Sequence, residues 1–502
     1  MTKSTLSGLA WQYTSVFTQA LLQLAVLALL ARLLSPEDFG LLGIAMIFVG
    51  FAALFSQLGV GPAIIQRSEL TTTHIRVGFT LSILLSLALT LILWIITPIA
   101  VRFFHNDKLL TVLPVVSLNF FFAGFGVVAA SLLRRKLQFN RLMWAEVGSY
   151  VLGYALVGIT LAWMDYGVWA LVGATLAQSA LKSGFLLLSQ HHPLRPSLSR
   201  PELRELIHFG GGFTLARMFN YGATQGDYIV VGRVLGSADL GLYTRAYQLM
   251  MLPGRYFGQV LNTVLFPVMA RIQKDRRRLT KTYLTGVASV SIVCAPIGVL
   301  MVIMAPEIVR LLLGPKWSGV VIPFQLLAIG VLPRVSYKLD DALARALGAM
   351  YRRSVRDATY AAAVILGSLL GLRWGLPGVA VGVLAAVLLN YLLAVRMSLG
   401  LLSCSWSEYA RTQAPGAFLT LVVLVEALSI RTILYANGYP AWFILTTVVL
   451  ISAASIVGLF LIYPRIFGVY GVDAFSTIVS LMPQQRFAGT FSKWLQARTN
   501  NV

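Results

Sequence analysis

The feature that most constrains this chain is a series of long apolar stretches. Each is about as long as the roughly 20 residues that a helix needs to cross a hydrocarbon core about 30 Å thick. About fourteen of them occur, at residues 10–34, 40–63, 76–101, 111–133, 142–163, 168–189, 207–233, 240–266, 282–304, 319–345, 357–373, 375–397, 412–434 and 441–463. Only 12% of the residues are charged, against about 25% in a typical soluble domain. A soluble fold is therefore excluded.

The stretches predict helices because they lack the alternation of polar and apolar residues that marks the strands of a membrane barrel. A segment in hydrocarbon must also satisfy its own backbone hydrogen bonds, and a helix does so internally. The expected fold class is all-α, a polytopic membrane protein of about 14 transmembrane helices.

The positive charges predict the orientation. The net charge is +22, and with the N-terminus inside, 25 of the 40 Lys and Arg residues fall on the cytoplasmic side and 8 on the other. Cytoplasmic loops of membrane proteins carry such an excess of cations. We therefore expect both termini to be cytoplasmic, and the basic excess requires no nucleic-acid partner.

Two segments about two hundred residues apart form an internal repeat. Residues 31–41 and 232–242 share Arg, Leu, Asp, Gly and Leu in register, and the apolar stretches after them both end near a proline, Pro62 and Pro267. Six spans separate the copies, an even number, so both lie on the same side of the membrane. This indicates parallel repeats about an axis along the membrane normal, with a central cavity between two pseudo-symmetric lobes.

The repeat predicts the domain organisation. We expect an N-terminal lobe at 1–190 with about six spans, a cytoplasmic linker at 191–206, a C-terminal lobe at 207–463 with about eight spans, and a cytoplasmic tail at 464–502. Three prolines interrupt the linker, and residues 201–209 then read as a short interfacial helix. The tail fits either an interfacial segment or a solvated polar one.

Polar and charged residues inside the spans are the main functional signal, since each charge costs at least about 2.5 kcal/mol at a helix centre unless it is sheltered. Three spans carry them at helical spacing, which places them on one face of each helix. The seventh span carries Arg217, Asn220, Tyr221, Thr224, Asp227 and Tyr228; the eighth carries Arg245, Gln248, Arg255, Gln259 and Asn262; and the tenth carries Arg334, Lys338, Asp341 and Arg345.

These stripes predict an anion-binding cavity. Together with Asp340 they hold six cations against three carboxylates, and five of the cations are arginine. The planar guanidinium donates paired hydrogen bonds that suit phosphate. The predicted substrate-binding residues are Arg217, Asn220, Arg245, Gln248, Arg255, Gln259, Arg334 and Lys338.

A purely structural role is the alternative for these groups. Intramembrane Arg and Asp can pair to hold helices together, and a cation near a span end can extend to the surface. This alternative carries at least equal weight for Arg345, Glu146 and Lys182, and Glu426 has no evident partner in the sequence.

Enzyme signatures are missing from the sequence. It contains no Walker loop, no HExxH and no GxSxG, and the five histidines fall in expected loops or at span ends. We therefore expect no catalytic residues, no cofactor and no metal. Any driving force for transport would come from an ion gradient, the membrane potential or the supply of substrate.

The repeat segments carry a family resemblance. Residues 29–41, 57–66 and 232–243 resemble the polysaccharide-transporter branch of the multidrug/oligosaccharidyl-lipid/polysaccharide (MOP) exporter superfamily, the Wzx-type flippases. The resemblance covers nearly the whole chain in length, span number and two-lobed layout.

The resemblance implies a MATE-like fold with alternating access in a bacterial inner membrane. It implies a substrate of undecaprenyl-pyrophosphate-linked glycan for exopolysaccharide or lipopolysaccharide biosynthesis, with membrane lipids, a polysaccharide polymerase and glycosyltransferases as partners. Family members are often discussed as ion-coupled antiporters, and the candidates for ion coupling here are Asp227, Asp341, Asp340 and Glu146.

Three other functions stay open. A multidrug cation exporter of the same superfamily would need a net acidic cavity, whereas a lipid II flippase shares the preference for an anion. A membrane-embedded polymerase or ligase would be expected to carry a large periplasmic loop, and the outside loops here are short.

Overall fold

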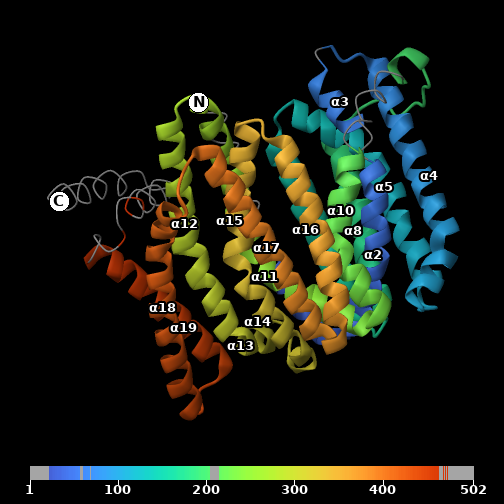
Figure 1. The fold of residues 1–502 in the computed structure, drawn as a ribbon. Coiled ribbons are helices and arrows are strands. Elements are labelled where there is room, and N and C mark those ends of the chain that lie inside the picture. Colours follow the sequence, from blue (N-terminus) through green and yellow to red (C-terminus); the bar gives the residue numbers. More distant parts are fainter. Residues whose placement is uncertain are drawn as a thin grey trace. The chain divides into compact units, whose positions relative to one another are not determined.

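The computed structural model describes residues 22–56, 60–67, 69–203 and 214–462, together with residues 467, 470 and 472. Within these ranges the side chains of 56, 214–220, 223 and 256–264 are left undescribed. Every regular element in the described ranges is a helix (Figure 1). The all-α fold class is therefore confirmed.

The chain divides into two compact units, residues 1–244 with 312–316, and residues 245–311 with 317–502. The first contains α2 (Pro36–Ser56), α3 (Val60–Gln66), α4 (Thr72–Phe104), α5 (Leu109–Arg135), α6 (Phe139–Ser149), η1 (Tyr150–Val157), α7 (Gly158–Trp163), α8 (Val168–Ser189) and α10 (Thr214–Val234). The long helix α11 (Ser237–Arg271) begins in the first unit and continues in the second.

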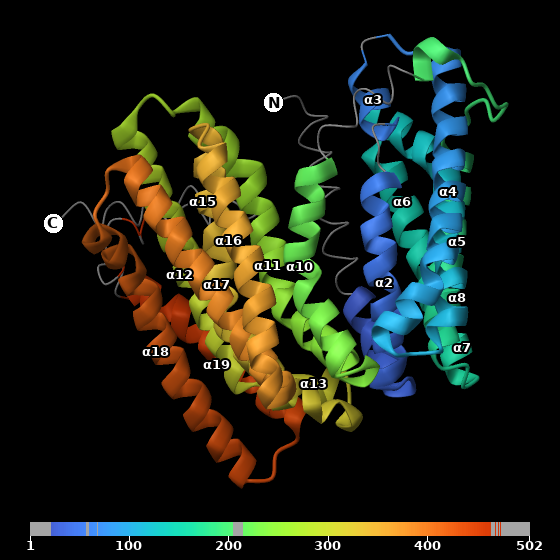
Figure 2. The ribbon, with the colours of Figure 1, turned by 45° about the vertical axis from the view of Figure 1, so that its right-hand side comes forward.

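The second unit holds the remaining helices except for residues 312–316, which belong to the first unit. These helices follow one another in the yellow to red part of the chain (Figure 2). They are α12 (Arg276–Ile303), α13 (Ala305–Leu312), η3 (Pro315–Val320), α14 (Val321–Ile329), α15 (Val331–Ala346), α16 (Met350–Gly371), η4 (Leu372–Trp374), α17 (Gly375–Leu402), α18 (Trp406–Ala436) and α19 (Ala441–Ile462). Each apolar stretch found in the sequence coincides with helices of this series or, for 10–34, with the described helix Leu22–Leu33.

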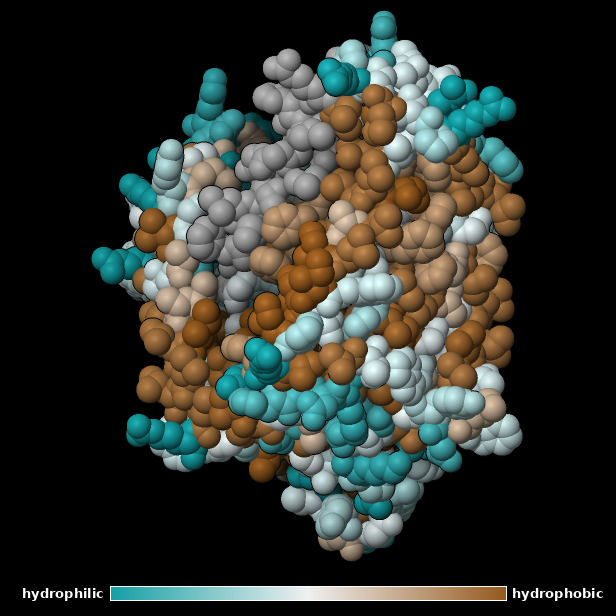
Figure 3. All heavy atoms as spheres, turned by 90° about the vertical axis from the view of Figure 1, so that its right-hand side faces the viewer, coloured by the Kyte–Doolittle hydropathy of each residue, from teal (hydrophilic) through white to brown (hydrophobic). Residues whose placement is uncertain are grey.

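The helices have the length and composition of membrane spans. In the described part of the chain nine helical segments pass this test, and the bent pair Pro315–Ile329 and Val331–Ala346 passes it jointly. One of the nine, Met350–Leu402, comprises both α16 and α17, while α10 and α11 carry too many polar residues to pass. Figure 3 shows hydrophobic residues gathered across the middle of one face and hydrophilic ones toward its ends. This set is consistent with the 14 expected spans.

The prediction of one continuous helix at 319–345 is wrong. The segment consists of η3, α14 and α15, and α14 and α15 are bent by 42° with Gly330 between them. Pro333 lies in the first turn of α15, where its missing N–H is tolerated, whereas its ring would clash with the carbonyl of Ile329 in a continuous helix. The proline therefore accounts for the break.

The predicted span 142–163 is helical throughout but changes type. Its middle part, η1, is a π-helix between α6 and α7. Gly153 in η1 lies against the backbone of α8, where an added Cβ would be 2.5 Å from the Cα of Gln178. The absence of a side chain at Gly153 thus allows η1 and α8 to approach closely.

Helices α16 and α17 form an antiparallel hairpin whose backbones touch. An added Cβ on Gly367 would lie 2.6 Å from the carbonyl oxygen of Gly382, and one on Gly371 would lie 2.3 Å from that of Gly378. The reversal at Gly375 has φ +64°, a conformation that favours glycine. Small residues at such contacts are the usual means of close helix packing in membranes.

The predicted linker is non-helical between His191 and Ser199, and a helix resumes at Arg200. The compact units, by contrast, divide within α11, after Thr244. The expected domain boundaries at 190 and 207 stay a prediction, and residues 204–213 and nearly all of the tail at 464–502 lie outside the described residues.

The two repeat segments meet in the first unit through a reciprocal contact. An added Cβ on Gly40, near the start of α2, would lie 1.6 Å from the carbonyl oxygen of Ser237. An added Cβ on Gly241, near the start of α11, would lie 1.8 Å from the carbonyl oxygen of Pro36. The equivalent glycines of the repeat therefore occupy equivalent positions in one pseudo-symmetric helix crossing.

Replacing Gly40 by alanine tests this crossing. The new methyl group has no space against Ser237, so we expect Gly40→Ala to lower the free energy of unfolding by about 1–3 kcal/mol. Gly43→Ala is the matched control in the same helix, since its Cβ would lie 3.6 Å from Leu240, in ordinary contact. Thermal unfolding of the purified protein in detergent measures both, and equal stability of the two variants would contradict the contact.

Candidate functional site

The polar stripe predicted on α11 lies partly in the described second unit. Arg245 and Gln248 are both half-buried, and the Arg245 Nη1 donates a hydrogen bond of 2.6 Å to the Gln248 Oε1. Arg255 is exposed on the same helix. The side chains of Arg217, Asn220 and Gln259 lie outside the described residues.

Two cations of α15 contact α11 within the second unit. Arg334 is buried, and its Nη1 donates a 2.8 Å hydrogen bond to the Tyr247 hydroxyl, with the guanidinium 4.9 Å from the centre of the Tyr247 ring. The Lys338 Nζ donates a 2.8 Å hydrogen bond to the carbonyl oxygen of Gly254. Both acceptors are neutral groups of α11, and the bonds position the two cations.

The stripes of α11 and α15 are therefore neighbours in space. The structural role held open for intramembrane cations applies to Arg334 and Lys338, because their hydrogen bonds join α15 to α11. Fixed cations held by neutral groups are also what an anion site requires. The binding role of these residues stays a prediction.

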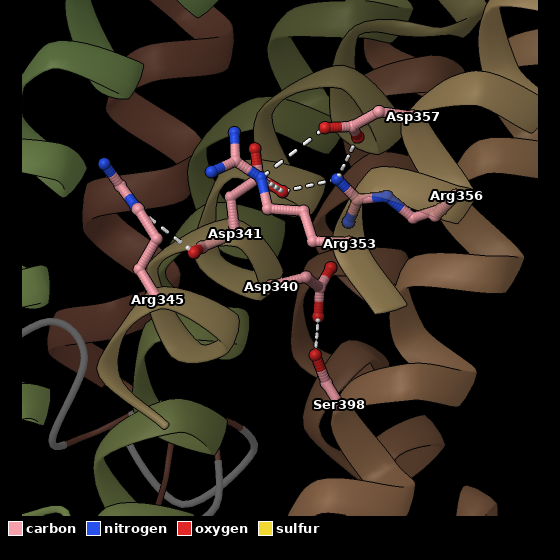
Figure 4. A network of polar contacts seen from close by, with 7 residues as sticks. All are labelled: Asp340, Asp341, Arg345, Arg353, Arg356, Asp357 and Ser398. Carbon is pink, nitrogen blue, oxygen red and sulfur yellow. Dashed lines mark hydrogen bonds and ion pairs between the residues drawn. The ribbon is translucent and has the colours of Figure 1, made fainter. Parts of the chain in front are cut away.

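The two adjacent aspartates of α15 point into different surroundings (Figure 4). Asp340 is 1% exposed and accepts hydrogen bonds from the Tyr283 hydroxyl of α12 at 2.7 Å and the Ser398 hydroxyl of α17 at 2.6 Å. Among the described residues no Lys, Arg or His nitrogen lies within 4.0 Å of it. Asp340 is thus a buried carboxyl whose hydrogen bonds, within the part of the chain that the structure describes, come from hydroxyl groups.

Asp341 instead belongs to an ion-pair network with the start of α16 (Figure 4). It contacts the Arg353 Nε at 3.3 Å and pairs with the Arg356 Nη2. Asp357 joins the network, 2.7 Å from Arg356 and 3.6 Å from Arg353. Arg345 donates through Nε to the backbone carbonyl of Asp341 and lies 4.9 Å from the centre of the Phe266 ring.

The other two candidates for ion coupling are placed in the first unit. Asp227 is 2% exposed and accepts a 2.9 Å hydrogen bond from the Tyr243 hydroxyl. Glu146 pairs with Lys182 at 3.1 Å, which joins α6 to α8 and fits the structural alternative for both residues.

Sequence reasoning missed several of these partners. Arg353 and Arg356 precede the expected span 357–373, so the sequence predicts a cytoplasmic loop there, whereas α16 begins at Met350 and Arg356 is 4% exposed. Tyr283 lies among other polar residues at the start of its expected span, and Ser398 lies just after the end of one, so neither stood out as a partner. The ion pair of Glu307 with Arg431, at 2.8 Å, joins α13 to α18 and was also missed. In the described residues no three His, Cys, Asp or Glu side chains gather as a metal site would require.

The comparison with protein families decides the identity of the chain. A family described as polysaccharide biosynthesis protein matches residues 29–322, which is more than half of the chain. The chain belongs to this family. The resemblance inferred from the repeat segments is thereby confirmed.

Two relatives extend this polysaccharide biosynthesis family match. Lipopolysaccharide biosynthesis protein WzxC of Escherichia coli (strain K12) is 24% identical over 439 residues, which cover 86% of this chain and 88% of that protein. Teichuronic acid biosynthesis protein TuaB of Bacillus subtilis (strain 168) is 26% identical over 386 residues, which cover 74% of this chain and 79% of that protein.

Solved structures share the fold. A lipid II flippase MurJ in an inward closed conformation has a TM-score of 0.70 at 15% identity and covers 88% of this chain and 97% of its own. An inward-facing multidrug resistance MATE family transporter of the MOP superfamily has a TM-score of 0.62 at 19% identity. The match covers 79% of this chain and 95% of that transporter. At these identities the likeness shows the fold alone, and that fold is the MATE-like one expected.

Replacing Arg356 tests the ion-pair network of this family member. Removing the buried Arg356 leaves Asp341 and Asp357 with Arg353 as their remaining cation in this network, so we expect Arg356→Met to destabilise the protein by up to about 3–5 kcal/mol. Arg352→Met, at an exposed position of the same helix, should change stability by less than about 0.5 kcal/mol.

The second substitution Asp341→Asn, combined with Arg356→Met, should restore part of the loss because it removes a carboxylate that has lost one of its two arginine partners. Chemical unfolding in detergent micelles measures the free energy of unfolding of Arg356→Met, Arg352→Met and the double variant. Equal effects of Arg356→Met and Arg352→Met would refute the network.

Proposed function

We propose that this protein is a flippase that moves undecaprenyl-pyrophosphate-linked oligosaccharide repeat units across the bacterial inner membrane. It serves exopolysaccharide or lipopolysaccharide biosynthesis, works by alternating access and is not an enzyme. The observation that carries the proposal is the set of membrane cations Arg245, Arg334 and Lys338, which lie on the neighbouring helices α11 and α15. A diphosphate is an anion that such cations would bind while its lipid chain stays in the bilayer.

The family and the relatives support the same substrate class. WzxC and TuaB bear names of lipopolysaccharide and teichuronic acid biosynthesis, and both polymers are made from sugars. The multidrug alternative is disfavoured because an organic cation would be repelled by the same arginines. A lipid II flippase shares the anion preference, so lipid II is the competing substrate to test.

The distribution of Lys and Arg supports one orientation of the protein in the membrane. The 25 to 8 distribution of Lys and Arg supports cytoplasmic termini. The substrate would then enter from the side on which lipid-linked sugars are assembled. Glycosyltransferases and a polysaccharide polymerase are the proposed partners before and after transport.

Proton coupling through Asp340 completes the proposal. A buried carboxylate with no compensating cation costs several kcal/mol, and binding a proton removes that charge. Asp341 and Glu146 are paired with cations, so their charge is compensated. Asp340 is therefore the favoured ion-coupling residue among these three.

Leaflet exchange of a fluorescent undecaprenyl-pyrophosphate oligosaccharide in proteoliposomes tests the flippase. We expect Arg255→Ala to slow exchange about tenfold or more, because a hydrogen bond to a charged group is worth about 1.5–3 kcal/mol. Arg277→Ala, exposed at the start of α12, removes the same charge outside the spans and should leave the rate unchanged. Exchange of lipid II but not of the oligosaccharide lipid would instead indicate a lipid II flippase. Export of organic cations would indicate a multidrug exporter.

A pH gradient across the same liposomes tests the coupling. Wild-type exchange should respond to the gradient, and Asp340→Asn should lose the response while keeping exchange down a substrate gradient, because asparagine keeps the size and binds no proton. Glu146→Gln is the control and should keep the response, since Glu146 is paired with Lys182. A wild-type level of response in Asp340→Asn would show that Asp340 is not the ion-coupling residue.

A further inference from the structure

An apolar groove runs over the hairpin of α16 and α17 in the second unit. Its volume is about 610 Å³, within the range of cavities that hold a small ligand. The four glycines of the crossing, Gly367, Gly371, Gly378 and Gly382, form its floor, and large side chains such as Leu370 and Trp374 line it. Leu370 is 67% exposed and Trp374 is 72% exposed, so the groove opens at the surface of the unit.

The lining is entirely of apolar residue types, and both helices have the composition of membrane spans. A groove of this composition suits an apolar ligand. Pairs of glycines four residues apart usually serve to bring two helices together. Here they already do so, because Gly367 meets Gly382 and Gly371 meets Gly378 within the hairpin. Both glycine pairs are therefore engaged within the hairpin.

The N-terminal end of α16 is cationic. Between Asp341 and Asp357 the chain carries four arginines and two aspartates, a net excess of positive charge. Arg356 is 4% exposed, and although its Nη2 is engaged by Asp341 and Asp357, its Nε and Nη1 meet no hydrogen-bond acceptor among the described residues. A buried guanidinium with unused donors is a feature that an anion would satisfy.

The cationic end and the groove belong to one face of α16. Ala363, the first residue of α16 in the groove lining, follows Arg356 by seven residues, which is two helical turns and about 10 Å along the axis. Helix α16 thus presents cations at one end and a continuous apolar groove beyond them. This layout complements an amphiphile that has an anionic head and one long chain.

We propose that the groove and the arginines at the start of α16 form a docking site for the polyprenyl diphosphate carrier. The isoprenoid chain lies in the groove between α16 and α17, and the diphosphate lies near Arg353 and Arg356. The inference rests on the proposed function, since it identifies where the lipid part of that substrate binds. The arginine end of α16 is the one expected to face the cytoplasm, so this site receives the carrier before it is moved.

Photo-crosslinking tests the site. The probe is undecaprenyl diphosphate with a diazirine in its isoprenoid chain, incorporated with the full-length protein into nanodiscs, and labelled peptides are mapped by mass spectrometry. We expect labelling of α16 and α17, reduced at least fivefold in Ala363→Phe, which fills the groove. Ala362→Phe introduces the same side chain at the neighbouring exposed alanine, outside the groove lining, and should label like wild type.

Two further arms identify the ligand. A probe with the same chain but an alcohol head should label about tenfold less, because it offers no anion to the arginines. Excess unlabelled undecaprenyl diphosphate should compete, whereas dioleoyl phosphatidic acid should not. Equal labelling of the two phenylalanine variants, or equal competition by phosphatidic acid, would overturn the proposal, as would dimers of wild type that Ala363→Phe abolishes.

Leaflet exchange measured on the same samples separates this inference from the function on which it rests. Exchange in wild type without any difference in labelling between Ala363→Phe and Ala362→Phe would refute the groove and leave the flippase standing. Labelling of the groove without exchange would refute the flippase and leave the docking site. Thermal unfolding of both variants shows whether each retains the wild-type fold.

Discussion

The lack of hydrogen-bonding partners in a hydrocarbon core is the constraint on which the rest of this structure depends. It explains why the described regular elements are helices, and it requires each intramembrane charge to find a partner in the protein. Several of these partners lie on other helices. Glu307 pairs with Arg431, Glu146 pairs with Lys182, and Lys338 donates to a backbone carbonyl of α11. The charges therefore do two things at once, since the contacts that shelter them also hold the helices in register.

Close backbone contact is the second means of holding the helices, and it depends on glycine. The crossing of α2 with the start of α11 and the hairpin of α16 with α17 both place a carbonyl oxygen where a Cβ would otherwise lie. In lipid there is little hydrophobic force between helices, so close packing contributes a large share of their association. Because glycine has no side chain, the glycines of α16 and α17 also leave a groove at the surface of this hairpin. One sequence device thus produces both a tight contact and a groove.

The sequence predicted the fold well because hydropathy reports directly on the dominant constraint, and the repeat turns at Gly40 and Gly241 proved to be in contact. It did not predict the break at Gly330, because a long apolar run reads as one helix whatever its bend. Nor did it assign Arg356 to a helix interior, since a charged residue beside an apolar stretch reads as a loop. Partners such as Tyr283 and Ser398 come from helices far apart in the chain, and spacing within one helix carries no information on them.

The surroundings of Asp340 and Asp341 differ in how they compensate charge. Successive residues of a helix point about 100° apart, so Asp340 faces the hydroxyls of α12 and α17 while Asp341 faces the arginines of α16. An ionised Asp340 would hold its charge in a buried site where, among the described residues, only the two hydroxyl donors compensate it. A protonated Asp340 is compatible with them. In the proposed flippase, proton binding at Asp340 would therefore remove a buried charge from α15, the helix that begins at the bend beside Gly330.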